Sequence, residues 1–219
     1  MHRLLRRGAA LACALVVLAF AHTAAPAGGL QVSPVTLTLQ PAQNADGLWL
    51  SNTGNAVVHA QVRVFRWTQE DGAEKLTPSR DLMVSPPMVQ VAAGDRQLVR
   101  VVRANAPPGP VETSYRVFID ELPVEMKERK GLQLVLRYSV PIFIAPAGAQ
   151  PGAPRLAWAL REEKGPAGLQ GGNSGGMPAQ LSDLDFVDTA GRRTTLHAGL
   201  MGYVVAGGQV RWALHGAGA

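Results

Sequence analysis

The sequence has one cysteine, Cys13, among its 219 residues. A single thiol cannot form a disulfide within the chain, and it cannot supply the thiolates of a structural zinc site. Histidine is scarce as well: beyond residue 27 only His59, His197 and His215 remain, and no two of them are close in sequence. Because zinc needs three or four clustered ligands, we expect no metal and no cofactor.

Aromatic residues and helical patterns are also rare. Phe, Trp and Tyr make up 5% of the residues, too few for a binding face of clustered rings. The four tryptophans (Trp49, Trp67, Trp158 and Trp212) fall in expected strands, so we interpret them as core residues. No segment beyond residue 27 has a helical period, so no glycine-rich loop leads into a helix to cradle a phosphate. We expect neither a nucleotide site nor an enzyme.

Residues 1–27 have the pattern of a secretory signal peptide. Arg3, Arg6 and Arg7 precede an apolar stretch, and Ala25-Pro26-Ala27 fits the small-residue cleavage pattern. We expect cleavage after Ala27, with Ala21 as the second option, and export to the periplasm. No later apolar stretch is long enough to cross a membrane, so we expect no stable membrane insertion.

The positive charge of the chain lies largely in this leader. The formal charge is +5, and the three leader arginines account for three of those charges, which leaves about +2 for the mature chain. This small excess gives no reason to expect a nucleic-acid partner.

The rest of the sequence consists of short alternating or β-branched runs separated by turn residues, which is typical of all-β sandwiches. The expected strands of the first part are Leu30–Leu39, Gly47–Ser51, Val57–Trp67, Leu82–Val84, Met88–Val91, Gln97–Arg103, Thr113–Leu122 and Gln133–Ile144. Those of the second part are Arg155–Arg161, Gly168–Gly171, Ala179–Val187, Thr194–Ala198, Met201–Val205 and Gln209–Leu214.

Between these two parts lies a Pro- and Gly-rich, uncharged stretch, Ala145–Ala153, with the composition of a linker. We therefore expect two tandem β domains, 28–146 and 154–219, joined by a hinge at 147–153. The second is small for a sandwich of about 100 residues, and it is possibly incomplete.

One motif resembles the nucleophile loop of trypsin-like proteases. Residues Gly171–Pro178 read GGNSGGMP. A serine nucleophile needs a histidine base and an orienting acid, and none of the histidines beyond the leader has a suitable context. We interpret the motif as a glycine-rich hairpin loop.

The stretch 131–146, GLQLVLRYSVPIFIAP, alternates with a period of two. Leu132, Leu134 and Leu136 fall on one face of an extended strand, and Gln133, Val135 and Arg137 fall on the other. The segment before it, ELPVEMKERKG, carries six charges, so the strand follows an exposed loop and could lie at a sheet edge. Periodicity leaves open whether the leucines pack in this protein's core or in that of another protein.

The order of several motifs resembles the PapD-like family of periplasmic pilus chaperones of the chaperone–usher pathway. The motifs are LQVSPVTLTL, SNTGNAVVHAQVRVFRW, SPPMVQVAAGDRQLVRVV, SYRVFIDELP, LQLVLRYSVPIFIAP, LAWAL and GYVVAGGQVRW. The resemblance implies two immunoglobulin-like β-sandwich domains in a boomerang arrangement. It also implies a chaperone that binds pilin subunits without nucleotide and delivers them to an outer-membrane usher for pilus assembly.

The resemblance assigns a role to the leucine strand. Leu132, Leu134 and Leu136 match the donor positions that the family inserts into the open groove of a pilin, by donor-strand complementation. The family also anchors the C-terminal carboxylate of the subunit with a basic pair. Here those positions are Thr36 and Pro141, a departure that resembles the archaic branch, related to spore-coat-U-type pili.

A carboxylate still requires a charged partner. Arg116, on the strand beside the donor, is our first candidate, and Arg137 is the second; the alternative for each is a solvated arginine on a strand face. The resemblance further implies that Pro86 and Pro87 contact the usher, although they also suit an ordinary turn at a strand edge. Glu121 matches a hinge acid, for which Arg155 is a candidate partner.

Two other functions remain open at this point. The chain could be an exported immunoglobulin-like binding module, or it could be a pilus subunit. A subunit would usually be a single domain with an N-terminal donor extension, whereas here the leucine strand lies in mid-chain between two expected domains.

Overall fold

A computed structural model describes residues 29–104, 107–123, 134–148, 152–161 and 168–214. All regular structure in these ranges is β-strand, so they contain no helix that could span a membrane. The N-terminal strands are β1 (Leu30–Ser33), β2 (Leu37–Leu39), β3 (Ala45–Asn52), β4 (Val58–Glu70), β5 (Ala73–Pro78), β6 (Leu82–Ser85), β7 (Met88–Val91), β8 (Arg96–Arg103), β9 (Thr113–Leu122) and β10 (Arg137–Ile144). The C-terminal strands are β11 (Leu156–Arg161), β12 (Gly168–Asn173), β13 (Ala179–Val187), β14 (Arg193–Val204) and β15 (Gln209–Ala213).

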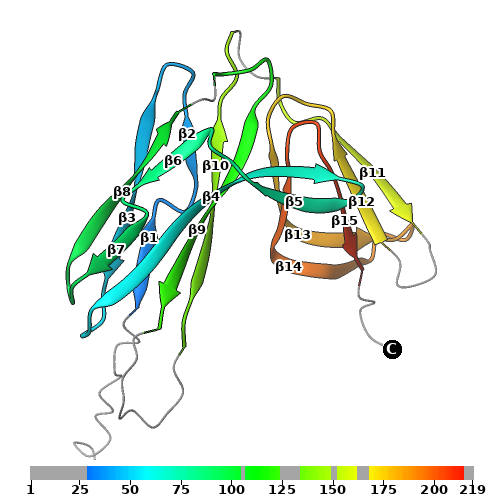
Figure 1. Ribbon diagram of the computed structural model, residues 1–219. Coiled ribbons are helices and arrows are strands. Elements are labelled where there is room, and N and C mark those ends of the chain that lie inside the picture. The colour runs from blue at the N-terminus through cyan, green and yellow to red at the C-terminus, as the bar shows by residue number, and fades with distance from the viewer. Residues whose placement is uncertain (1–28, 105–106, 124–133, 149–151, 162–167, 215–219) are drawn as a thin grey trace, which may run out of the picture.

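The strands form two domains set at an angle to each other (Figure 1). In the N-terminal domain, the sheet β1-β3-β8-β6 lies against the sheet β2-β10-β9-β4-β5, and β7 pairs with the first part of β4. In the C-terminal domain, the three-stranded sheet β11-β12-β15 accompanies the two-stranded sheet β13-β14. The expected all-β, two-domain architecture is confirmed.

Strand β9 shows how the alternating sequence builds the N-terminal core. Tyr115, Val117 and Ile119 are fully buried between the two sheets. The residues between them, Arg116 and Phe118 among them, lie on the opposite face because successive side chains of a strand point to opposite sides. This outer face of the β10-β9-β4 sheet is the one that meets the C-terminal domain through Trp67, Phe143, Val205 and Tyr203.

A hairpin of the N-terminal domain reaches across to the C-terminal domain. Strands β4 and β5 turn at Asp71 and Gly72, both in the left-handed region with φ of 54° and 79°. Gly72 forms a bridge with Val210 of β15, and its carbonyl accepts a hydrogen bond of 2.9 Å from the Arg211 N–H. The two domains are therefore joined by backbone pairing as well as by side-chain packing.

The expected strands differ from the structure in several places. The single strand Leu30–Leu39 is wrong, because the chain bends after Ser33 and continues as β2 in the opposite sheet. The two strands expected within 194–205 form one strand, β14. Strand β5 was not expected, because all its residues are exposed and its sequence does not alternate. Gly171–Pro178 connects two sheets and is not the hairpin loop that was expected.

The tryptophans do not share one environment. Trp67 is fully buried, as expected, whereas Trp49 and Trp158 are exposed. The guanidinium of Arg96 covers the ring of Trp49 at 4.5 Å from its centroid. The interpretation of Trp49 and Trp158 as core residues is therefore wrong.

Candidate functional site

Strand β10 has one edge that is only partly used. Its whole length, Arg137–Ile144, pairs antiparallel with β9. On the other side β2 pairs with the last three residues alone, Ile142–Ile144, in parallel. In the part of the chain that the structure describes, no strand pairs with the outer edge of Arg137–Val140. We call this stretch the free edge.

Two hydrogen bonds show which backbone N–H and carbonyl groups of β10 point toward the free edge. The Leu136 carbonyl accepts from the Glu121 N–H of β9 at 2.9 Å, and the Ala145 N–H donates to Leu39 of β2, also at 2.9 Å. Even-numbered residues therefore face β9 and odd-numbered residues face outward, because neighbouring residues of a strand direct these groups to opposite edges. Arg137 and Ser139 each present an N–H and a carbonyl at the free edge, whereas Pro141 lies where the parallel pairing with β2 begins and directs its carbonyl toward Leu37.

The leucines precede this edge on the core side of the strand. Leu134 and Leu136 share the alternation of Val140 and Ile142, which are buried in the N-terminal core. Their own side chains are 73% and 39% exposed. The two leucines therefore lie on the same side of the strand as the buried core residues, but beyond the end of the core, where they are exposed. Leu132 lies outside the described residues.

The expected strand Gln133–Ile144 begins too early. Leu134–Leu136 is not a strand in the structure, and β10 starts at Arg137. Its partner β9 ends at Leu122, one residue beyond Glu121, whose N–H bonds to Leu136. Residues before Leu136 have no β9 ladder to join, and an alternating sequence alone does not form a ladder.

Arg116 lies where the two domains meet. Its position on β9 is opposite Pro141 of β10, so both side chains are on the outer sheet face. The guanidinium is 3.7 Å from the ring centroid of Trp67 and 5.6 Å from that of Tyr203, and it forms a 3.7 Å ion pair with Glu74. Only 14% of the side chain is exposed. Burial lowers the pKa of Arg116, although Glu74 and Tyr203 counteract this shift.

Arg137 lies at the other end of the same face. It is mostly exposed and forms an ion pair with Asp120, which also binds Arg63 at 2.6 Å. Burial would raise the pKa of Asp120, but hydrogen bonds from Arg137 and Arg63 outweigh it and lower that pKa. The structure therefore separates the two candidate arginines: Arg116 is stacked at the domain junction, and Arg137 is a surface arginine beside the leucines.

Three other residues singled out by the resemblance lie in connections between strands. Thr36 is exposed on the bend between β1 and β2. Pro86 and Pro87 connect β6 to β7, and so cross from one sheet to the other. The Pro87 carbonyl accepts a hydrogen bond of 2.8 Å from the Val62 N–H.

The expected hinge acid is wrong. Glu121 lies near the end of β9 that is remote from the junction, and its Oε1 atom has no hydrogen-bond partner among the described residues. The buried acid at the junction is Glu112, which precedes β9. Burial raises the pKa of Glu112 to about 7, and no described residue bonds to its Oε1 atom. Nothing in the sequence around Glu112 distinguishes it from a surface acid.

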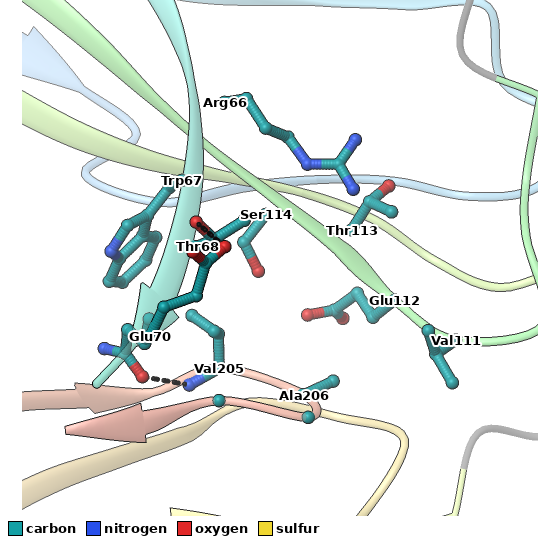
Figure 2. Close-up of a pocket in the computed structure, with 13 residues that line it drawn as sticks. Arg66, Trp67, Thr68, Glu70, Val111, Glu112, Thr113, Ser114, Val205 and Ala206 are labelled. Carbon is teal, nitrogen blue, oxygen red and sulfur yellow. Dashed lines mark hydrogen bonds between the residues drawn. The ribbon is translucent and has the colours of Figure 1, made fainter. Parts of the chain in front are cut away.

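Glu112 borders a pocket of about 220 Å³ between the domains. In Figure 2 its carboxylate points into this space, with Thr113 and Ser114 on one side and Val205 and Ala206 on the other. The segments that enclose the pocket come from β4, from the start of β9 and from the β14–β15 turn. Among the described residues, no cluster of three or more His, Cys, Asp or Glu could hold a metal there or elsewhere.

Gln69 connects the two domains at the junction by hydrogen bonds. The sequence analysis did not identify this residue. Its side chain is buried; Nε2 donates to the Tyr203 carbonyl at 2.7 Å, and Oε1 accepts from the Val205 N–H at 3.0 Å. The approach is close, since a Cβ atom on Gly208 would lie 2.8 Å from Gln69 Oε1. The carboxamide thus pairs with β14 in the way a neighbouring strand would.

Comparisons with known proteins agree with this architecture. Residues 29–150 match the family described as pili and flagellar-assembly chaperone, PapD N-terminal domain. No curated protein is similar enough to match the chain.

A similar solved structure is the pre-assembly complex of the chaperone CsuC and the tip adhesion subunit CsuE, from archaic chaperone–usher Csu pili of Acinetobacter baumannii. It matches with a TM-score of 0.71 and 27% identity, over 87% of this chain and 89% of that chain.

Two further structures share the fold at lower identity. The Pseudomonas aeruginosa chaperone CupB2 has a TM-score of 0.55 and 19% identity, over 84% of this chain and 88% of that one. The Salmonella enterica complex of the pilin SafA with the chaperone SafB has a TM-score of 0.57 and 20% identity, over 86% and 85%. The chain is similar to CsuC of the archaic Csu pili. The family match covers more than half of the chain, and the chain therefore belongs to the PapD-like family of pili and flagellar-assembly chaperones.

Proposed function

We propose that this protein is a periplasmic chaperone that binds pilus subunits by donor-strand complementation and delivers them to an outer-membrane usher. The observation that carries the proposal is the free edge Arg137–Val140, continuous with exposed Leu134 and Leu136 on the core side of the strand. An exposed apolar edge is normally a liability for a folded protein. It becomes useful when the protein lends that edge to another chain.

The free edge and the leucines would make different contacts with the subunit. The N–H and carbonyl groups of Arg137 and Ser139 would pair with a subunit strand, and Leu132, Leu134 and Leu136 would fill the groove of the subunit. Burial of three leucines contributes roughly 5–9 kcal/mol as an upper value. Association and ordering costs reduce it.

The C-terminal carboxylate of the subunit would bind Arg116. Pro141 lies beside Arg116 on the same sheet face, so the carboxylate would reach the place where the family resemblance expects a basic side chain. Without a bound subunit, Glu74 forms a long ion pair with this guanidinium, at 3.7 Å. A carboxylate in direct hydrogen-bonding contact would displace Glu74, because charge-assisted bonds of normal length are stronger.

The usher would contact the N-terminal domain at Pro86 and Pro87. Met83 and Met88 flank these prolines and are more than half exposed. The prolines lead into β7, which is separated from β10 by β4 and β9 in the sheet, so the usher could bind while a subunit is held. The leader at 1–27 would send the chain to the periplasm, where such subunits fold.

Co-expression with a candidate pilin from the same genome tests the proposal. We expect a stable one-to-one complex that co-purifies from the periplasm. Substitution of both Leu134 and Leu136 by Glu should abolish the complex and leave the chaperone folded, because both side chains are already exposed.

Val187→Glu is the matched control, since Val187 is an equally exposed apolar residue in the C-terminal domain. This variant should still hold the subunit. If the double leucine variant retains the subunit, donor-strand binding through these residues is wrong.

A further inference from the structure

Tyr138 lies at the boundary between the buried part of β10 and the exposed leucines. Its side chain is on the core side of the strand, between Val140, which is buried, and Leu136, which is 39% exposed. The ring of Tyr138 is partly buried and packs against the N-terminal core. The residue itself belongs to the free edge, so it belongs both to the core and to the candidate binding strand.

The hydroxyl of Tyr138 connects the two sheets of the N-terminal domain. It donates a hydrogen bond to the carbonyl of Leu30, in β1, the edge strand of the opposite sheet. The Thr53 N–H donates to the Gly29 carbonyl at 3.2 Å, so the next carbonyl, that of Leu30, points away from β3. The phenol therefore satisfies a backbone acceptor that the neighbouring strand β3 cannot reach.

The same bend that ends β1 accounts for the free edge of β10. Leu30–Ser33 pairs in one sheet, whereas Leu37–Leu39 pairs in the other, beside Ile142–Ile144. Opposite Arg137–Val140 the chain therefore lies in the other sheet, and the Tyr138 hydroxyl reaches across to it. The hydrogen bond thus connects β10 to β1 at the side of the sandwich where β10 has no strand beside it.

The surroundings of the phenol keep it protonated. Burial raises the pKa of Tyr138, and the carboxylate of Glu121 raises it further. Glu121 is on the core side of β9, and its N–H donates to the Leu136 carbonyl at 2.9 Å, at the end of the ladder between β9 and β10. A protonated phenol is a hydrogen-bond donor, so the bond to Leu30 is available at neutral pH.

We propose that Tyr138 is a positioning residue for subunit binding, whose hydrogen bond to Leu30 orders the free edge and Leu136 before a subunit arrives. This inference rests on the function proposed above. Ordering a flexible segment on binding reduces affinity, and a strand that is ordered in advance is competent in a larger fraction of molecules. Loss of the hydroxyl should therefore slow association. Dissociation should change little, because the bound subunit itself orders the strand.

Tyr138→Phe removes the hydroxyl and keeps the ring, and hydrogen exchange of the free chaperone is the first readout. The Glu121 N–H, which bonds to the Leu136 carbonyl, should exchange roughly tenfold faster, because this end of the ladder opens more often. Tyr115→Phe is the matched control. The Tyr115 hydroxyl donates to Asp81 at 2.9 Å in the same domain, but at the opposite end of the ladder between β9 and β10. It should leave the Glu121 N–H unchanged.

Binding kinetics with the candidate pilin of the co-expression test are the second readout. Tyr138→Phe should lower the association rate constant about three- to tenfold and leave the dissociation rate constant within about twofold. Tyr115→Phe should keep both rate constants. A hydroxyl that only stabilised the fold would change the melting temperature without this difference between association and dissociation, so the kinetics separate positioning from stability.

The possible failures are distinguishable. An association rate of Tyr138→Phe equal to that of the parent protein would overturn the inference, and so would unchanged exchange of the Glu121 N–H. Either result would leave the donor-strand proposal intact, because that proposal depends on Leu134 and Leu136. A parent protein that binds no pilin would overturn the proposed function and this inference together.

Discussion

The guanidinium of Arg116 lies 3.7 Å from the centre of the Trp67 ring, so a strand of the N-terminal sheet presents a cation held in place by an aromatic ring at the domain junction. Tyr203, from the C-terminal domain, lies on the same cation at 5.6 Å. Its ion pair with Glu74 is long, at 3.7 Å, so this buried guanidinium keeps much of its capacity to bind a carboxylate.

Removal of Arg116 should weaken subunit capture far more than removal of Arg137. A charge-assisted hydrogen bond contributes about 1.5–3 kcal/mol, so we expect Arg116→Ala to lower affinity roughly 10- to 100-fold. Arg137→Ala should change affinity by less than about threefold, since an exposed ion pair contributes little. Titration of each variant with purified pilin measures the effect.

Arg116→Lys provides the control for charge. It keeps the cation but loses the planar guanidinium that stacks on Trp67, so it should recover part of the affinity. If Arg116→Ala and Arg137→Ala bind alike, the carboxylate is anchored elsewhere.

Ser139→Pro should weaken subunit binding without destabilising the fold. The Ser139 N–H faces the free edge and makes no ladder bond with β9, whereas the Val140 N–H faces β9. We expect Ser139→Pro to retain the native melting temperature within a few degrees and to lose subunit affinity, because proline removes an edge donor.

Val140→Pro is the matched variant one residue away. It should destabilise the protein by about 3 kcal/mol or more, because it removes a ladder bond in mid-sheet. Circular dichroism melting and pull-down assays distinguish the two results. Unchanged subunit binding by Ser139→Pro would show that the backbone of this edge is not used.

Glu112 should make the stability of the protein fall between mildly acidic and neutral pH. Burial raises the pKa of this carboxyl from 4.5 to about 7, so the folded state favours the protonated form. The stabilisation from this protonation is complete below about pH 4.5 and is lost as the pH rises from there to about 7. Above pH 7 the folded protein contains an unpaired buried carboxylate.

Glu112→Gln should remove this dependence. At pH 8 we expect the variant to be more stable than the parent protein by about 1–3 kcal/mol, and at pH 4 we expect little difference. Urea unfolding at both pH values measures the two free energies. If the free energies of unfolding of the parent protein and Glu112→Gln differ by the same amount at both pH values, the pH dependence does not come from Glu112.

Gln69 should hold the domains together. Gln69→Ala leaves the Val205 N–H and the Tyr203 carbonyl without their partner at a buried junction, which costs about 1–3 kcal/mol for each group left unsatisfied. We expect a lower unfolding midpoint and a broader distribution of domain angles in small-angle scattering. Thr68→Ala, at the neighbouring position of β4, is the control and should change neither measurement.

Periodicity predicted the strands whose two faces differ in polarity. Thr113–Leu122 and Ala179–Val187 have the boundaries expected from alternation. It failed for Ala73–Pro78, where every residue is exposed and the Asp71-Gly72 turn is the only local signal. It also failed for Leu30–Leu39, because one alternating run cannot indicate that its two halves pair in different sheets.

The candidate site was predictable only in part. The leucine positions followed from the alternation and from the family resemblance, which the comparisons bear out at the level of the family. Glu112 and Gln69 had no such signal, since their roles depend on contacts with a turn and a strand of the other domain.

The sequence by itself determined the fold class, the two-domain organisation and the family, because alternation, turn residues and motif order are local properties of the chain. Only the tertiary structure decided which strand edges lack a partner and which arginine is held at the junction. Those properties depend on pairs such as Arg116 with Tyr203 and Asn173 with Val204, whose members meet only after long stretches of chain have folded. No local pattern encodes which strand will be a neighbour and which position will have none.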